Sequence, residues 1–207
     1  FEAMLASPDT EQLGLRGLFL EAQREGEAIA ATQFAERALK LNPKLEWPSA
    51  ALFDLQCKAK DWAGALDTAA SAKRHGHIDK KVADRRRAVL LTAQAQAMED
   101  SHADKAAELA TEAHNLAPDL VPAAAIAGRV LASRGQTPKA AKVLLRTWKS
   151  VQHPELAAIY AHARPGDSVS DRLERVRQLA KSTPHANEGP IALAAAAIEA
   201  RDWKLAK

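Results

Sequence analysis

The side chains that could bind a metal ion are few and lie far apart in the sequence. The best candidates, His75 and His77, flank Gly76, and a His-Gly-His turn can bind a metal weakly. Residues two apart do not share one face of a helix. The same three residues are also typical of a helix end, where Gly stops the helix and His interacts favourably with its dipole. Because the sequence has no Cys pair, no His-Glu-x-x-His and no acidic calcium loop, we predict no metal site.

Haem would need an axial ligand and a large apolar pocket. The side chains able to ligate its iron are His75, His77, His102, His114, His153, His162, His185, Cys57, Met4, Met98 and Tyr160. There is no Cys-x-x-Cys-His motif, and aromatic residues make up only 4% of the chain. We therefore predict no cofactor, and a haem or porphyrin carrier is kept as an alternative function.

Motifs of enzymes are absent from the sequence. It contains no Gly-x-Ser-x-Gly, no phosphate-binding loop and no dinucleotide fingerprint. Asp54 and Asp61 are seven residues apart, but such acids on helices usually face solvent. Cys57 has no second Cys to pair with, which fits a reducing compartment and a role as a small packing residue. We predict that the chain is not an enzyme.

The charge balance is mild. The 29 Lys and Arg residues face 26 Asp and Glu residues, which gives a formal net charge of +3. The one dense basic cluster, Lys80-Lys81 with residues 85–87, would spread over more than one helix face and stands beside Asp79 and Asp84. A nucleic-acid-binding protein usually shows a basic stripe, so we predict no nucleic-acid partner.

The elements that must carry these side chains are helices. The sequence has 47 Ala and 24 Leu against 14 Val and Ile together, and hydrophobic residues reach 47%. Strong helix formers thus greatly outnumber strand formers. A β-sandwich, a barrel or a doubly wound sheet would need many more β-branched residues. The composition predicts an all-α protein.

A repeat organises these helices. Pro43 and Pro118 each follow an Ala by five residues, and a further Ala lies seven residues before that one. The spacings from Ala31 to Ala65 and from Ala106 to Ala140 are both 34 residues. We expect close helix–helix contacts at Ala31, Ala38, Ala65, Ala72, Ala106, Ala113 and Ala140. The pattern of small residue, turn, Ala, Ala and Pro resembles the 34-residue tetratricopeptide repeat.

The expected fold is a tetratricopeptide-like right-handed α-solenoid of stacked antiparallel helix pairs, with residues 1–207 as a single domain. The units are about 11–43, 46–77, 79–118, 120–153, 154–184 and a truncated 188–207. About seven extra residues lengthen a first helix around residues 79–87. Ser170 or Asp171 is expected to cap a helix that runs to about Ser182. Arg201-Asp202-Trp203 repeats Lys60-Asp61-Trp62 as a turn, and both Trp are expected to pack between helices.

The resemblance also implies a binding surface, because tetratricopeptide proteins build a concave face mainly from the first helix of each pair. The residues that this places in a groove are Arg16, Leu20, Arg24, Trp47, Asp54, Lys58, Met98 and Arg129. Such a groove would suit acidic peptide ends or carboxylates, with a few apolar pockets. The expected partners are other proteins or peptides.

Some segments resemble a narrower family. They are residues 10–18 with 22–26, then Asn42-Pro43 with Trp47, then residues 60–66, and they are similar to the HemY-type proteins of proteobacteria. The resemblance implies an association with haem (protoporphyrin) biosynthesis. It also implies a bacterial inner-membrane protein with two N-terminal spans and a soluble region on the cytoplasmic side. The chain would then be a part of that soluble region, and haem-biosynthesis enzymes would be candidate partners.

The expected function is thus a non-catalytic interaction scaffold of a membrane-anchored protein associated with a late stage of haem biosynthesis. An unrelated bacterial tetratricopeptide adaptor in envelope assembly or secretion is the alternative within the same class.

Overall fold

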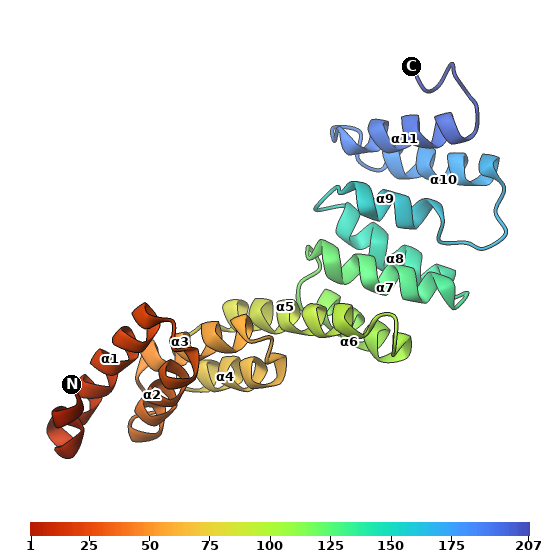
Figure 1. Cartoon of the computed structure of the whole chain (residues 1–207). Coiled ribbons are helices and arrows are strands. Elements are labelled where there is room, and N and C mark those ends of the chain that lie inside the picture. Colours follow the sequence, from red (N-terminus) through yellow and green to blue (C-terminus); the bar gives the residue numbers. More distant parts are fainter. The chain divides into compact units, whose positions relative to one another are not determined.

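The computed structural model describes residues 1–207 and is helical throughout (Figure 1). Its elements are η1 (Glu2–Ala6), α1 (Pro8–Glu25), α2 (Ala28–Leu41), α3 (Glu46–Lys58), α4 (Trp62–Arg74), α5 (Lys80–Met98), α6 (Ala103–Leu116), α7 (Val121–Ser133), α8 (Thr137–Trp148), α9 (Pro154–Ala161), α10 (Val169–Lys181) and α11 (Glu188–Glu199). Consecutive helices pack as antiparallel pairs, which is the architecture of an α-solenoid. The chain divides into two compact units, Phe1–Leu90 and Leu91–Lys207. The single-domain assignment stays a prediction.

The first unit is built from α1 to α4 and the beginning of α5. Helix α1 packs on α2, α2 on α3 and α3 on α4. Its core combines the small residues Ala31 and Ala35 with the larger Phe19 and Leu52. Small side chains let the helix backbones approach closely, and the larger ones fill the space that remains.

The second unit runs from the end of α5 to α11. Ala95, near the end of α5, shares a core with Ala106 and Ala110 of α6 and with α7 and α8. Trp148, at the end of α8, is 1% exposed, and its indole N–H donates to the hydroxyl of Thr183 at 2.9 Å. Helix α5 is the longest helix, with 19 residues, so the extra residues lengthen a first helix as predicted.

The seven Ala that the sequence places at close helix contacts are all buried. Ala31, Ala38, Ala65, Ala72, Ala106, Ala113 and Ala140 are at most 2% exposed. This confirms the packing role expected from their spacing.

Several turns between helices share one pattern of backbone hydrogen bonds. In each, one N–H donates to the carbonyl three residues back, and the next N–H donates to the carbonyl five residues back. The residues that begin this pattern are Gly26, Lys60, Gly76, Gly135 and Arg201. Asp61 and Asp202 also each accept a bond from the N–H three residues later. The two Asp-Trp turns are therefore similar in structure as well as in sequence.

Two expected details are wrong. Helix α10 is capped by Ser168, not by Ser170 or Asp171, because Ser168 and Asp171 form a reciprocal capping box. Trp203 is 61% exposed rather than packed. The segment after Asp202 forms only a turn, so no second helix is present for its ring to pack against.

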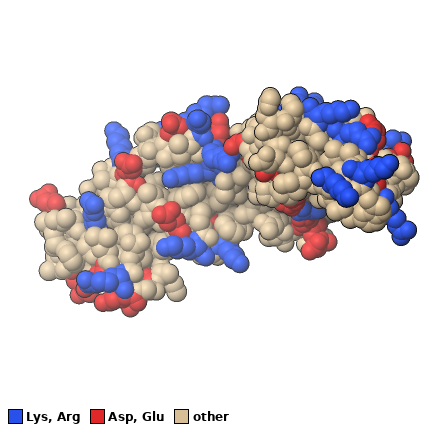
Figure 2. All heavy atoms as spheres, turned by 90° about the horizontal axis from the view of Figure 1, so that it is seen from above, with Lys and Arg blue, Asp and Glu red and all other residues tan.

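The surface carries interspersed charges. Lys and Arg side chains alternate with Asp and Glu over the face seen in Figure 2. None of the helices is long and apolar enough to span a bilayer.

Candidate functional site

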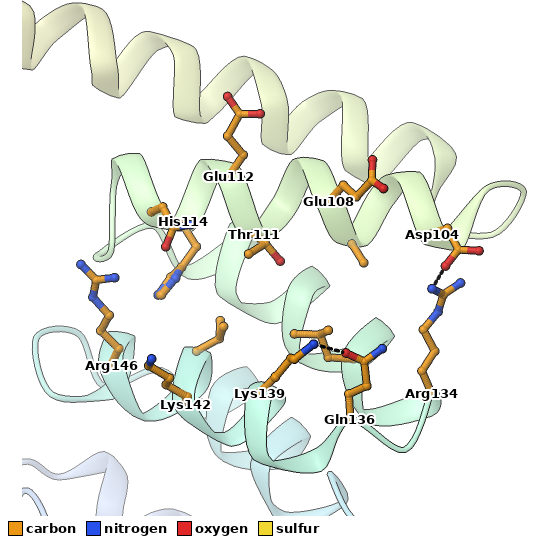
Figure 3. A pocket seen from close by; sticks show the side chains of 14 residues that line it. Asp104, Glu108, Thr111, Glu112, His114, Arg134, Gln136, Lys139, Lys142 and Arg146 are labelled. Carbon is orange, nitrogen blue, oxygen red and sulfur yellow. Dashed lines mark hydrogen bonds and ion pairs between the residues drawn. The ribbon is translucent and has the colours of Figure 1, made fainter.

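A groove of about 650 Å³ runs between α6 and α8, which are each the second helix of a pair (Figure 3). Its α6 wall carries Asp104, Glu108, Thr111, Glu112 and His114. Its other wall carries Arg134, Gln136, Lys139, Lys142 and Arg146, all on α8 except for the first two, which lie in the turn before it. Ala107, Leu131 and Val143 supply apolar surface.

Helical spacing explains why each wall carries one sign of charge. Asp104, Glu108 and Glu112 are four residues apart, so they follow one side of α6. On α8, Lys139, Lys142 and Arg146 are three and four residues apart and share one side in the same way. The buried Ala140 and Leu144 hold the other side of α8 in the core.

The acidic wall is largely neutralised or turned away from the groove. Asp104 forms an ion pair with Arg134, and Lys105 binds Glu108 at 3.1 Å. Figure 3 shows the side chains of Glu108 and Glu112 leaving α6 on the side away from α8. Thr111 and His114 point toward α8 instead. The α6 wall therefore presents polar groups to the groove more than charge.

The basic wall keeps its charge. Lys139 donates a hydrogen bond to the amide oxygen of Gln136 at 2.9 Å, which leaves its charge without a carboxylate. Lys142 and Arg146 are exposed and take part in no ion pair. Three cations thus lie along one side of the groove, over about 10 Å of helix at 1.5 Å per residue.

His114 forms the inner end of the groove. It is 2% exposed, and its Nε2 lies 3.1 Å from the hydroxyl of Thr147, which donates to the carbonyl oxygen of Pro118 at 2.8 Å. Because that hydroxyl hydrogen is used, His114 donates to the hydroxyl oxygen through Nε2–H. Burial, and to a lesser extent the charge of Arg146, lower the pKa of His114 to about 4.

The residues that sequence reasoning placed on α1 are exposed. Arg16, Leu20 and Arg24 lie along one side of that helix, and Leu20 is 55% exposed. Leu13, which was not predicted, is exposed on the same side. The two leucines make this an apolar and basic stripe.

The three residues predicted on α3 differ in their surroundings. Trp47 is half-buried and packs with the core of the first unit, its ring centroid 5.3 Å from that of Phe19 on α1. Asp54 and Lys58 are exposed. The Phe19–Trp47 ring contact joins α1 to α3, which are both first helices of their pairs.

The two predicted residues of the second unit are already engaged. Met98 is half-buried against the core. Arg129 binds Glu99 through two nitrogens, at 2.9 and 3.1 Å, and Glu155 at 2.7 Å, and these bonds raise its pKa. Arg129 also borders a hollow of about 530 Å³ between α7 and α9. A partner carboxylate would have to compete with two carboxylates of the chain itself.

Sequence reasoning missed the groove between α6 and α8. The usable signal was periodic: like charges recur every three or four residues on one side of each of the two helices. The neutralisation of Asp104 by Arg134, thirty residues later, was not visible in that pattern.

No protein-family model matches the sequence, and neither does any curated protein. Two solved structures are similar to the chain. One is TTC0263, a thermophilic TPR protein in Thermus thermophilus, with 19% identity, a TM-score of 0.37, and coverage of 90% of this chain and 99% of that one. The other is YrrB, a TPR protein with an unusual peptide-binding site, with 15% identity, a TM-score of 0.46, and coverage of 89% and 88%.

The class of the protein rests on the chain's own repeat. The 34-residue spacing of buried Ala and the repeated turn bonds define a tetratricopeptide-like fold of stacked helix pairs.

Proposed function

We propose that the chain is a non-catalytic scaffold that binds other proteins or peptides, with the groove between α6 and α8 as its main contact. The observation that supports this most is the row of Lys139, Lys142 and Arg146, whose charges have no carboxylate partner beside an open groove. Charge without a partner in such a groove favours an external ligand. The stripe of Arg16, Leu20 and Arg24 is a second contact surface.

Partner capture with matched variants tests the proposal. The groove variant carries Lys139→Glu, Lys142→Glu and Arg146→Glu, and the stripe variant carries Arg16→Glu and Arg24→Glu. We expect the groove variant to lose most of the partner that the wild type retains. If only the stripe variant loses the partner, the partner binds the first-helix surface instead of the groove. Equal recovery by all three proteins would reject both surfaces.

The cellular role that we propose is narrower. The scaffold serves a late stage of haem biosynthesis on the cytoplasmic side of the bacterial inner membrane, and this rests on the resemblance of residues 10–18 and 60–66 to HemY-type proteins. Captured proteins should then include haem-biosynthesis enzymes, and deletion should change the porphyrin pool. Capture of envelope-assembly or secretion proteins with an unchanged porphyrin pool would support the adaptor alternative instead.

Titration with haem separates a scaffold from a carrier. The one buried imidazole at the groove, His114, uses its Nε2 toward Thr147 and is not presented as an axial ligand. We expect no Soret shift at micromolar protein. A saturable shift that His114→Ala abolishes would establish haem binding and reject a pure scaffold.

A further inference from the structure

We infer that the groove between α6 and α8 binds a short extended segment of a partner protein that carries acidic side chains, with its carboxylates on Lys139, Lys142 and Arg146. This inference rests on the proposed function and adds the chemistry and conformation of the ligand. Three properties of the groove carry it: its uncompensated charge, its length and its apolar surface.

The uncompensated charge selects acidic groups. Asp104 and Glu108 each have a cationic partner within the chain, whereas the three cations of α8 have no carboxylate partner. A bound carboxylate would therefore form charge-assisted hydrogen bonds without breaking an existing ion pair. The same carboxylate near Arg129 would have to displace Glu99 or Glu155. The groove is thus the more favourable of the two places for an acidic ligand.

The length of the groove sets the length of the segment. From Gln136 to Arg146 the groove follows ten residues of helical rise, about 15 Å. At about 3.3 Å per residue, it takes about four or five extended residues.

The apolar surface selects an alternating sequence. Leu131, Val143 and Ala107 lie between the charged walls, and the first two are 9% exposed. In an extended segment successive side chains point to opposite sides. A segment that alternates acidic and aliphatic residues can therefore place carboxylates on α8 and aliphatic side chains on this surface at once.

A nucleic acid would fit less well, although it is also anionic. The groove offers a phosphate backbone only the three cations Lys139, Lys142 and Arg146, along about 10 Å of α8. Binding to phosphates also needs a broad basic surface, and acidic side chains interrupt the basic ones on the face seen in Figure 2.

Three end-blocked fluorescent pentapeptides test the inference on the full chain. Their sequences alternate Leu with Glu, with Gln or with Lys, and a single-stranded oligonucleotide serves as a fourth probe. Fluorescence anisotropy should show the Glu peptide binding at least ten-fold more tightly than the Gln peptide, and the Lys peptide not binding. Lys142→Gln should weaken the Glu peptide about two- to five-fold, and Lys139→Gln, Lys142→Gln and Arg146→Gln together at least ten-fold.

The control removes the same charge elsewhere. Lys149→Gln, Lys181→Gln and Lys204→Gln change three exposed cations outside the groove and should leave the affinity within two-fold. Circular dichroism checks that both triple variants keep the wild-type helix content. Equal affinity for the Glu and Gln peptides, or tighter binding of the oligonucleotide, would overturn the inference. If groove variants lose a captured partner while the Glu peptide fails to bind, only the ligand chemistry is wrong and the scaffold proposal stands.

Discussion

At the scale of single residues, the most consequential polar contact is the buried one between His114 and Thr147. A neutral imidazole is held there in a site that disfavours its charged form. The folded-state pKa, about 4, lies below the unfolded value of 6.5. The unfolded chain therefore binds more protons between these values, so stability is full above pH 6.5 and is lost as the pH falls toward 4.

Acidification from pH 7 to pH 5 should lower the free energy of unfolding by about 2 kcal/mol through His114 alone. The measurement is urea denaturation at both pH values for the wild type and for His114→Asn, which keeps an N–H donor but cannot titrate. The pH dependence of the wild type should exceed that of the variant by this amount. Parallel curves would show that His114 is not held neutral by the fold.

Lys60 and Arg201 carry backbone strain that glycine would relieve. Their φ angles of +58° and +57° lie in the left-handed region, where the equivalent turn at Gly26 has glycine. The left-handed conformation costs a non-glycine residue about 1–2 kcal/mol, and part of this is offset because glycine loses more entropy on folding.

Lys60→Gly should accordingly raise the free energy of unfolding by about 0.5 kcal/mol. Lys58→Gly, at the last residue of α3, is the matched control and should lower it by up to about 1 kcal/mol. Chemical denaturation of both variants compares the two positions. A loss of stability in both would mean that the side chain of Lys60 contributes more than its backbone costs.

At the scale of elements, helix pairs are limited by how closely two backbones approach. Gly128 of α7 faces Leu144 of α8, and a methyl group at Gly128 would come within 2.7 Å of the Leu144 side chain. Leu144 is 1% exposed and has little room to move. Overpacking of this kind costs about 1–3 kcal/mol.

A double-mutant cycle checks this contact. Gly128→Ala should destabilise by about 1–3 kcal/mol in the wild-type background and by less than half as much when Leu144→Ala has already created space. Gly135→Ala is unsuitable as a control because Gly135 has φ +71°. Ala141→Gly, on α8 away from the contact, reports the propensity effect alone. Additive losses in the cycle would show that the two side chains do not meet.

Elements also show what the sequence could and could not predict. The helix pairs were predictable because close packing demands a small residue at a fixed spacing. That spacing is visible in the sequence at the buried Ala31, Ala65, Ala106 and Ala140. The cap of α10 was missed because two serines and an aspartate compete within residues 168–171, and only the reciprocal bonds of Ser168 and Asp171 decide between them.

The candidate site was less predictable than the fold, because it depends on which charges neutralise one another. Arg129 was expected to face a partner, but Glu99 and Glu155, thirty residues before and twenty-six after it, occupy its guanidinium. Lys142 and Arg146 looked like ordinary helix surface. They stand out only once α6 is placed opposite them and its own acids are found to be paired or turned away.

At the scale of the whole molecule, contacts between helices are mostly between neighbours along the chain. Within the first unit α1 packs on α2, α2 on α3 and α3 on α4, and within the second α7 packs on α6, α8 and α9. In such a stack the stability is approximately a sum over units and their interfaces. A local defect should then act locally.

Native-state hydrogen exchange of Gly128→Ala tests this directly. Amides of α7, α8 and α9 should lose protection equivalent to about 1–3 kcal/mol, because α8 and α9 pack directly on α7. Amides of α1 and α2 should stay within about 0.3 kcal/mol of the wild type, since no contact of that pair reaches the altered interface. The variant Gly17→Ala, which would meet the ring of Phe1, provides the reciprocal case in the first unit. Equal losses of protection at both ends in either variant would mean that the chain unfolds as one cooperative body.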